Sequence, residues 1–248
     1  MNTFYAKKPL IIAHRGASAV APENTLAAFR AAVEAGADGI EMDVMRCHSG
    51  ELMVVHDDTV DRTTDGSGLV RTISKDSLRM LDAGSWFGPE HAGQRIPTLD
   101  DVLPFVEGGI RLNIEIKSQG LRSEGLEEEI ADMIRAREYE DRILISSFNP
   151  LVLMRLRNVA PEIQRGLLYT PGSLRSSPRI WRHLVQPQAL HPHHSVVDEE
   201  YIRWAKENGY RVNVWTVNEA ERMREMIALD VDGIITDHPA RLRRFLYS

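Results

Sequence analysis

Short runs of Ile, Val and Leu alternate along this chain with amphipathic segments that are long enough to form helices. Strands separated by such segments form parallel βαβ units, because a parallel pair needs a crossover connection. Eight units in 248 residues predict an α/β protein with the (β/α)₈ TIM-barrel fold, as a single domain over residues 1–248. The predicted strands cover residues 10–16, 39–44, 111–117, 143–148, 165–170, 189–194, 212–217 and 233–237.

A further strand-like segment, residues 52–57, does not fit this repeat. It follows the second predicted strand too closely for a helical crossover, and the spacing suits an antiparallel hairpin that turns near His48, Ser49 and Gly50. We therefore expect an extra β-hairpin strand folded back on the second strand. The segment that follows has weak periodicity and many turn residues, and it predicts a small capping insertion of about residues 57–98 over the barrel mouth.

The charge and cysteine content narrow the classes of function. The chain has 30 Lys and Arg against 36 Asp and Glu, a formal net charge of −6. This mild acidity argues against nucleic acid and against stable membrane association, because both partners need a basic protein face. The single cysteine, Cys47, excludes an intramolecular disulfide. No long apolar run or signal peptide is present, so we expect a cytoplasmic protein, with a homo-oligomer left open.

Polar side chains stand at the carboxyl ends of the first predicted strands, and in a (β/α)₈ barrel these ends meet at one site. Residues two apart on a strand face the same side, so Glu41 and Asp43 share a face, as do Glu115 and Lys117. If the hairpin turns near His48 and Ser49, His56 lies roughly across from Glu41, also on that face. The expected site residues are His14, Arg15, Glu41, Asp43, His56, Glu115 and Lys117.

Three carboxylates within apolar strands are costly unless positive charge neutralises them. One interpretation is a buried salt-bridge network of these acids with Arg15 and Lys117. The three acids together favour a hard divalent cation, Mg²⁺ or Ca²⁺, because these ions prefer oxygen ligands. Zinc is a weaker candidate, since the acids lack a tight histidine cluster.

Two histidines beside such a site suggest paired acid and base roles, because imidazole titrates near neutral pH. Arg15 and Lys117 supply positive charge for an anionic group, and the arginine fork suits phosphate oxygens. A metal, two histidines and two cations around one cavity favour phosphoryl-ester chemistry. A glycosidase needs two metal-free carboxylates that flank the bond, and it would leave the histidines without a role.

The motifs around these residues resemble the glycerophosphodiester phosphodiesterase family. The similarity starts at His14-Arg15-Gly16-Ala17 and ends at Gly233-Ile234-Ile235-Thr236-Asp237, in family order over essentially the whole chain. The intervening matches are Pro22-Glu23-Asn24-Thr25, Glu41-Met42-Asp43-Val44, Val55-His56-Asp57, DRTTDGSG, IPTLDDVL, Ile114-Glu115-Ile116-Lys117 and Ser146-Ser147-Phe148.

The resemblance implies a barrel enzyme that hydrolyses glycerophosphodiesters, such as glycerophosphocholine, to sn-glycerol 3-phosphate and an alcohol. It implies His14 and His56 as the acid–base pair and Arg15 and Lys117 as phosphate contacts. The implied metal ligands are Glu41, Asp43 and Glu115. Two alternatives are a lysophospholipase D-like phosphodiesterase on the same scaffold and a non-catalytic phosphate-binding barrel. The first needs an apolar insertion, and the second leaves the histidine pair unexplained.

Other residues near the predicted strand ends carry weaker signals. Trp215 is either barrel packing or, as the resemblance suggests, an apolar substrate-binding wall, and Phe148 has the same two interpretations. Glu23 and Asn24 suggest a helix start with an acid in its first turn. The histidines of the 189–194 strand suggest rim packing or substrate contact rather than a second metal site; they are His191, His193 and His194.

Overall fold

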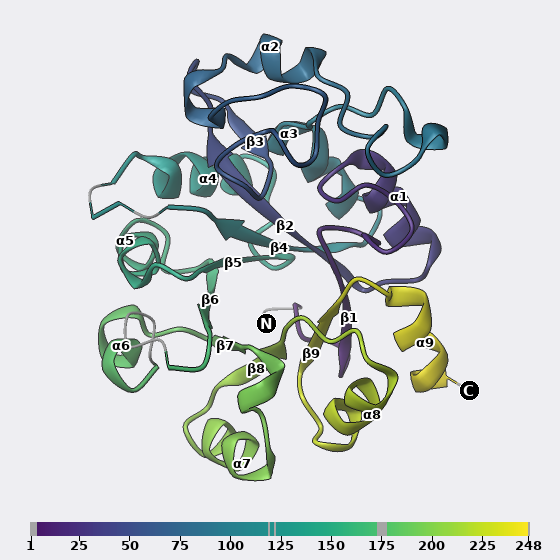
Figure 1. Cartoon of the computed structure of the whole chain (residues 1–248). Helices are drawn as coiled ribbons and strands as arrows, with labels where there is room; N and C mark the ends of the chain where they lie inside the picture. Colours follow the sequence, from purple (N-terminus) through teal and green to yellow (C-terminus); the bar gives the residue numbers. More distant parts are fainter. Residues whose placement is uncertain (1–3, 119, 122, 173–177, 248) are drawn as a thin grey trace.

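The computed structural model describes residues 4–118, 120–121, 123–172 and 178–247, and within them nine strands form one sheet. Parallel strands close on themselves in the order β1-β9-β8-β7-β6-β5-β4-β2, with β1 paired to β2. Figure 1 shows these strands around a central axis with helices outside them. The strands are β1 Leu10–His14, β2 Gly39–Arg46, β3 Leu52–Val54, β4 Arg111–Ile116, β5 Ile143–Ser147, β6 Gln164–Tyr169, β7 Ala189–Pro192, β8 Arg211–Val214 and β9 Gly233–Thr236.

Helices and short 3₁₀ turns connect the strands. The α-helices are α1 Leu26–Glu34, α2 Lys75–Met80, α3 Leu99–Val102, α4 Leu126–Arg135, α5 Pro150–Val159, α6 Pro178–Val185, α7 Glu199–Glu207, α8 Ala220–Ala228 and α9 Pro239–Tyr247. The 3₁₀ turns are η1 Val70–Thr72, η2 Pro89–His91, η3 Leu103–Val106 and η4 His194–Val196. No helix in the described part of the chain combines the length and apolar character that crossing a bilayer requires. The (β/α)₈ barrel predicted from the sequence is confirmed.

β2 shows why the barrel strands are nearly continuous apolar runs in the sequence. Seven of its eight residues are buried, because one face packs inside the barrel and the other against helices. Outside the barrel, apolar strand residues such as Ile40 and Met42 pack with helix residues such as Phe29 in the main core. Another cluster packs the N-terminal segment against barrel strands, and its buried members are Phe4, Leu10, Ile12, Leu144, Ala189 and Ile235.

The extra strand is confirmed as an antiparallel neighbour of β2, although it is shorter than predicted. β3 ends at Val54 rather than at residue 57, and its register pairs Val54 with Val44. The insertion that follows shares a separate apolar core with residues of the hairpin. Figure 1 shows the insertion beside β3, outside the ring of barrel strands. This core contains Met45, Cys47, Met53, Val55, Val60, Val70, Leu78, Ala83 and Ile96.

Short, capped connections hold the carboxyl ends of the strands in place. Thr25 accepts a hydrogen bond from the Ala28 N–H at the start of α1, and Asn149 does the same for Leu151 at the start of α5. The Asn149 amide also donates to the Ser118 carbonyl, which ties the ends of β4 and β5 together. The polar side chains at these strand ends therefore stand on rigid connections.

Candidate active site

The three predicted acids lie together at the carboxyl end of the barrel. The β2–β4 register places Asp43 opposite Glu115, and the β1–β2 register places Glu41 opposite His14. All three side chains are buried, and one carboxylate oxygen from each lies within 4.8 Å of the other two. Neighbouring strands thus aim three carboxylates at one point.

Within the described residues, the nearby cations do not offset burial and mutual repulsion for all three carboxylates, as their pKa values show. Burial and the nearby Asp43 carboxylate raise the pKa of Glu41, and the same two causes raise the pKa of Glu115 to about 7. Burial also acts to raise the pKa of Asp43, but Lys117 and Arg15 outweigh it and lower that pKa. A cluster of oxygen donors with two carboxyl pKa values raised fits a hard divalent cation.

Arg15 and Lys117 contact the acids from two sides. Lys117 Nζ lies 3.0 Å from Glu115 Oε1 and 3.5 Å from Asp43 Oδ1, while Arg15 Nε lies 3.3 Å from Asp43 Oδ2. Arg15 has a left-handed backbone with φ of 54°, and its N–H donates to Glu41 over 3.1 Å. Gly16 follows with φ of 86°, where a Cβ would lie 2.7 Å from Ala28.

Each predicted catalytic histidine is held by an aspartate that sequence reasoning did not assign to the site. Nδ1 of His14 lies 2.6 Å from Asp237, and Nδ1 of His56 lies 2.7 Å from Asp57. Such a bond fixes the ring and its tautomer, and it leaves Nε2 for chemistry. Asp237 ends the last predicted strand, so the rule that strand ends form the site contained a signal for it. Asp57 directly follows His56.

A cavity of about 210 Å³ joins these groups. Both histidines, Arg15, Glu41 and Glu115 line it together with apolar side chains. The apolar part is formed by Phe148, Leu168, Trp215 and Ile235. The cavity therefore has one side lined by charged residues and the two histidines, and an apolar side.

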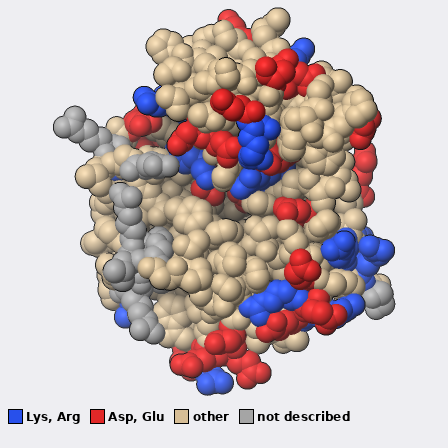
Figure 2. Space-filling model, viewed as in Figure 1, with Lys and Arg blue, Asp and Glu red and all other residues tan. Residues whose placement is uncertain are grey.

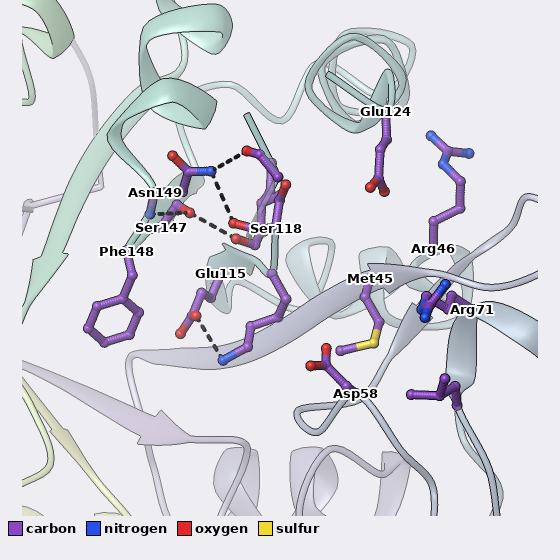
Figure 3. A pocket seen from close by; sticks show the side chains of 14 residues that line it. Met45, Arg46, Asp58, Arg71, Glu115, Ser118, Glu124, Ser147, Phe148 and Asn149 are labelled. Carbon is purple, nitrogen blue, oxygen red and sulfur yellow. Dashed lines mark hydrogen bonds and ion pairs between the residues drawn. The ribbon is translucent and has the colours of Figure 1, made fainter. Parts of the chain in front are cut away.

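A larger pocket of about 440 Å³ adjoins the first, and both are lined by Glu115 and Phe148. Figure 3 shows these two residues on one side of the pocket and Asp58 and Arg71, from the insertion, on the other. Glu124 and Arg46 also line it. Figure 2 shows acidic and basic side chains gathered around a hollow on this face of the molecule. A ligand that spanned the two pockets would pass beside Glu115.

Trp215 lies just after β8 and pairs with His193 through an isolated bridge. Its indole N–H donates to the His191 carbonyl over 2.8 Å. Its ring contacts Phe148 and His193 edge to face, with centroid distances of 5.4 and 5.3 Å. Trp215 and Phe148 therefore form part of the apolar side of the smaller cavity, and their role as a substrate-binding wall stays a prediction.

Three details of the sequence interpretation are wrong. His56 lies beyond β3, and continuing the register would set it opposite Met42 rather than Glu41; the bend after Val54 brings it to the cavity instead. His191 is fully buried inside the barrel, beside Asn213, so only the other two histidines of that segment lie at the rim. Burial lowers the pKa of His191 to about 3, which keeps it neutral.

The third correction concerns Glu23 and Asn24, which precede α1 instead of forming its first turn. Glu23 accepts a hydrogen bond from Arg15 over 2.9 Å, and the Asn24 amide donates to Asp43 over 2.9 Å. Both residues thus support the site. Their signal in the sequence was masked by Pro22 and Thr25, which are also typical of a helix start.

Comparisons with known proteins agree with this geometry. A model of the "Glycerophosphoryl diester phosphodiesterase family" matches residues 14–241. A glycerophosphodiester phosphodiesterase of Caldanaerobacter subterraneus subsp. tengcongensis is 43% identical over 95% of this chain and 96% of its own length. One from Bacillus altitudinis is 34% identical over 93% and 95% of the two chains.

Solved structures show the same similarity. An Oleispira antarctica phosphodiesterase, in complex with the product sn-glycerol-3-phosphate, has a TM-score of 0.85 and 33% identity, covering 98% of this chain and 99% of its own. A glycerophosphodiester phosphodiesterase of Agrobacterium tumefaciens has a TM-score of 0.83 and 30% identity, covering 95% and 99%. The chain belongs to the glycerophosphoryl diester phosphodiesterase family of enzymes.

Proposed function

We propose that this enzyme hydrolyses small glycerophosphodiesters to sn-glycerol 3-phosphate and an alcohol, with the help of a divalent cation. The observation that carries the proposal is the pairing of two aspartate-held histidines with three clustered carboxylates around one cavity. The product bound to the Oleispira antarctica relative supports the choice of substrate class.

Glu41, Asp43 and Glu115 would hold the cation, either Mg²⁺ or Ca²⁺. When bound, it would supply positive charge for the phosphate oxygens as negative charge grows on them. Arg15 and Lys117 would add to this charge, since each already contacts an acid of the cluster. All three acids are buried, so water screens these interactions less than it would at the protein surface.

His14 and His56 would carry out the two proton transfers. Burial lowers the pKa of His56, which favours a neutral imidazole ready to accept a proton. One histidine takes the proton from the attacking oxygen, and the other gives a proton to the departing alcohol oxygen. If water attacks, these two transfers give sn-glycerol 3-phosphate and the alcohol directly. If the neighbouring glycerol hydroxyl attacks, they give a cyclic phosphate and the alcohol, and water then opens the ring with the two histidines exchanging roles. Trp215 and Phe148 would pack against the glycerol moiety.

The larger pocket favours a small polar alcohol over a lysophospholipid. Its rim presents the charged side chains of Arg46, Asp58, Arg71 and Glu124, which an acyl chain would desolvate at a cost. We therefore expect kcat/KM for glycerophosphocholine to exceed that for lysophosphatidylcholine about tenfold or more. Product analysis by mass spectrometry checks both substrates. Equal or higher kcat/KM for lysophosphatidylcholine would favour the lysophospholipase D-like alternative.

The cation is expected to stabilise the fold more at high pH than at low pH. The pKa of Glu115 is raised to about 7 from its ordinary 4.5, so this carboxyl destabilises the metal-free fold as pH rises through that window. A cation needs the ionised carboxylate and competes with its proton. Added Mg²⁺ or Ca²⁺ should thus raise the melting temperature more at about pH 8 than at about pH 5.5.

Differential scanning fluorimetry of metal-free protein measures this effect, with Glu115→Gln as the matched variant. The variant cannot titrate at this position, so its cation-induced shift should be smaller and depend less on pH. Equal shifts of the wild type at the two pH values would contradict the assignment of Glu115 as a ligand.

A further inference from the structure

Arg62, from the insertion, joins two carboxylates that belong to different parts of the site. Its Nε lies 2.6 Å from Asp57 Oδ2. Its Nη1 and Nη2 lie 2.8 and 2.7 Å from the two oxygens of Glu23, which is a two-pronged arrangement. The pKa of Arg62 is raised, first by the hydrogen bonds to Glu23 and Asp57. All three nitrogens of its guanidinium thus bond one of these two acids.

Each of these carboxylates also holds a residue that faces the cavity. Asp57 uses its other oxygen for His56 Nδ1, at 2.7 Å, and Glu23 bonds Arg15 Nη1 at 2.9 Å. We propose that Arg62 is a positioning residue that sets the His56 ring and the Arg15 guanidinium at the same time. This inference rests on the proposed function, because it assigns work to residues of that reaction.

The contact that runs from Arg62 through Glu23 to Arg15 explains why Arg15 needs support. Arg15 lies between Glu23, at 2.9 Å, and the metal-site acid Asp43, at 3.3 Å. Burial acts to raise the pKa of Glu23, but Arg62 and Arg15 outweigh it and keep the carboxylate ionised. Without Arg62, Glu23 loses two of its hydrogen bonds and is free to turn with Arg15. The guanidinium then no longer has one fixed position for a phosphate.

The other contact runs from Arg62 through Asp57 to His56, which lies on an irregular segment beyond β3. Its ring is oriented by Asp57, a partly exposed side chain whose pKa is lowered to about 2, first by the hydrogen bond from Arg62. Loss of Arg62 frees the Asp57 carboxylate to rotate, and the ring loses its fixed direction. Misplacement of a catalytic group by about 1 Å lowers a rate by about a hundredfold.

The insertion therefore contributes a side chain that supports the site. Through Arg62 it contributes an ion-pair bridge between the acid–base side and the phosphate side of the cavity. A lysine at this position would keep the charge but lose the fork, because an ammonium group cannot bond two carboxylates in the same fixed plane. The geometry thus requires arginine and not only a positive charge.

The test compares Arg62→Ala and Arg62→Lys with Arg79→Ala, a matched control. Arg79 also lies in the insertion, is similarly exposed, and pairs with Asp101 away from both cavities. For glycerophosphocholine, Arg62→Ala should lower kcat about ten- to a hundredfold and raise KM about tenfold. Arg62→Lys should recover only part of each loss, and Arg79→Ala should change neither. Melting temperatures within about 4 °C of wild type exclude unfolding as the cause.

Double-mutant cycles separate the contact through Asp57 to His56 from the contact through Glu23 to Arg15. Arg62→Ala combined with Asp57→Asn should be non-additive in kcat, and combined with Glu23→Gln it should be non-additive in KM. Additive effects in both cycles, or unchanged kcat and KM in a stable Arg62→Ala variant, would overturn the proposal.

Calorimetric titration with inorganic phosphate tests the positioning of Arg15 by Arg62 in the absence of turnover. Phosphate should bind about tenfold more weakly to Arg62→Ala than to wild type and to Arg79→Ala. A wild type that binds phosphate but hydrolyses no glycerophosphodiester would contradict the proposed function alone. Equal phosphate affinity of wild type and Arg62→Ala would contradict the positioning of Arg15 by Arg62.

Discussion

Replacing His14 or His56 with alanine is expected to lower kcat by about a thousandfold while the fold is kept. General acid–base catalysis contributes about 10²–10⁴ in rate, and each ring would serve one of the two proton transfers. Both rings line the 210 Å³ cavity and neither lies in the apolar cores, so their loss leaves barrel packing intact. Steady-state kinetics with glycerophosphocholine, together with circular dichroism, measures both effects.

His183→Ala is a suitable control for these two variants. His183 is exposed on α6, its ring accepts a hydrogen bond from the neighbouring Arg182, and it lines neither cavity, so the change should leave kcat and KM unaltered. Near wild-type turnover of either His14→Ala or His56→Ala would disprove the acid–base assignment for that histidine.

Asp43→Asn should be equally damaging, for a different reason. Asp43 is only 1% exposed and receives contacts from Lys117, Arg15 and Asn24, so the uncharged amide removes the charge on which this cluster is built. An amide is also a weaker ligand for a hard cation than a carboxylate. We expect kcat to fall about a thousandfold at ordinary cation concentrations.

Titration of activity with Mg²⁺ and with Ca²⁺ checks this prediction. The variant should need a much higher cation concentration for any recovery. Asp132→Asn, an exposed change on α4 far from the acids, is the control and should match wild type. Wild-type activity of Asp43→Asn with unchanged cation dependence would remove Asp43 from the ligand set.

The fold was predictable because the barrel imposes one pattern throughout. Apolar strand runs and helical spacing indicated all eight barrel strands, and the short gap before residues 52–57 indicated the hairpin. Several predicted strands extended too far at their carboxyl ends, where the site lies. Arg15 already has a left-handed backbone, and Trp215 keeps only a bridge, because these residues serve the cavity rather than the sheet. A pattern of residue types does not show where the backbone leaves the sheet.

The predicted site residues came together because strand ends meet at one face, although their chemical roles stay predictions. The groups that hold them were harder to find. Asp237 is 223 positions from His14, and Arg62 is 39 from Glu23, so only the folded chain brings each pair together. Glu23 was misinterpreted because an acid after proline is also typical of a helix start. Contacts between distant side chains leave no periodic signal in a sequence.

The most direct test of the account is a coupled assay for sn-glycerol 3-phosphate release from glycerophosphocholine by metal-stripped and cation-restored enzyme. We predict product formation that stops after chelation and returns when Mg²⁺ or Ca²⁺ is added. Asp43→Asn assayed in parallel should not recover. Full activity after rigorous metal removal, or no sn-glycerol 3-phosphate under any of these conditions, would contradict the proposal of a cation-dependent glycerophosphodiester hydrolase.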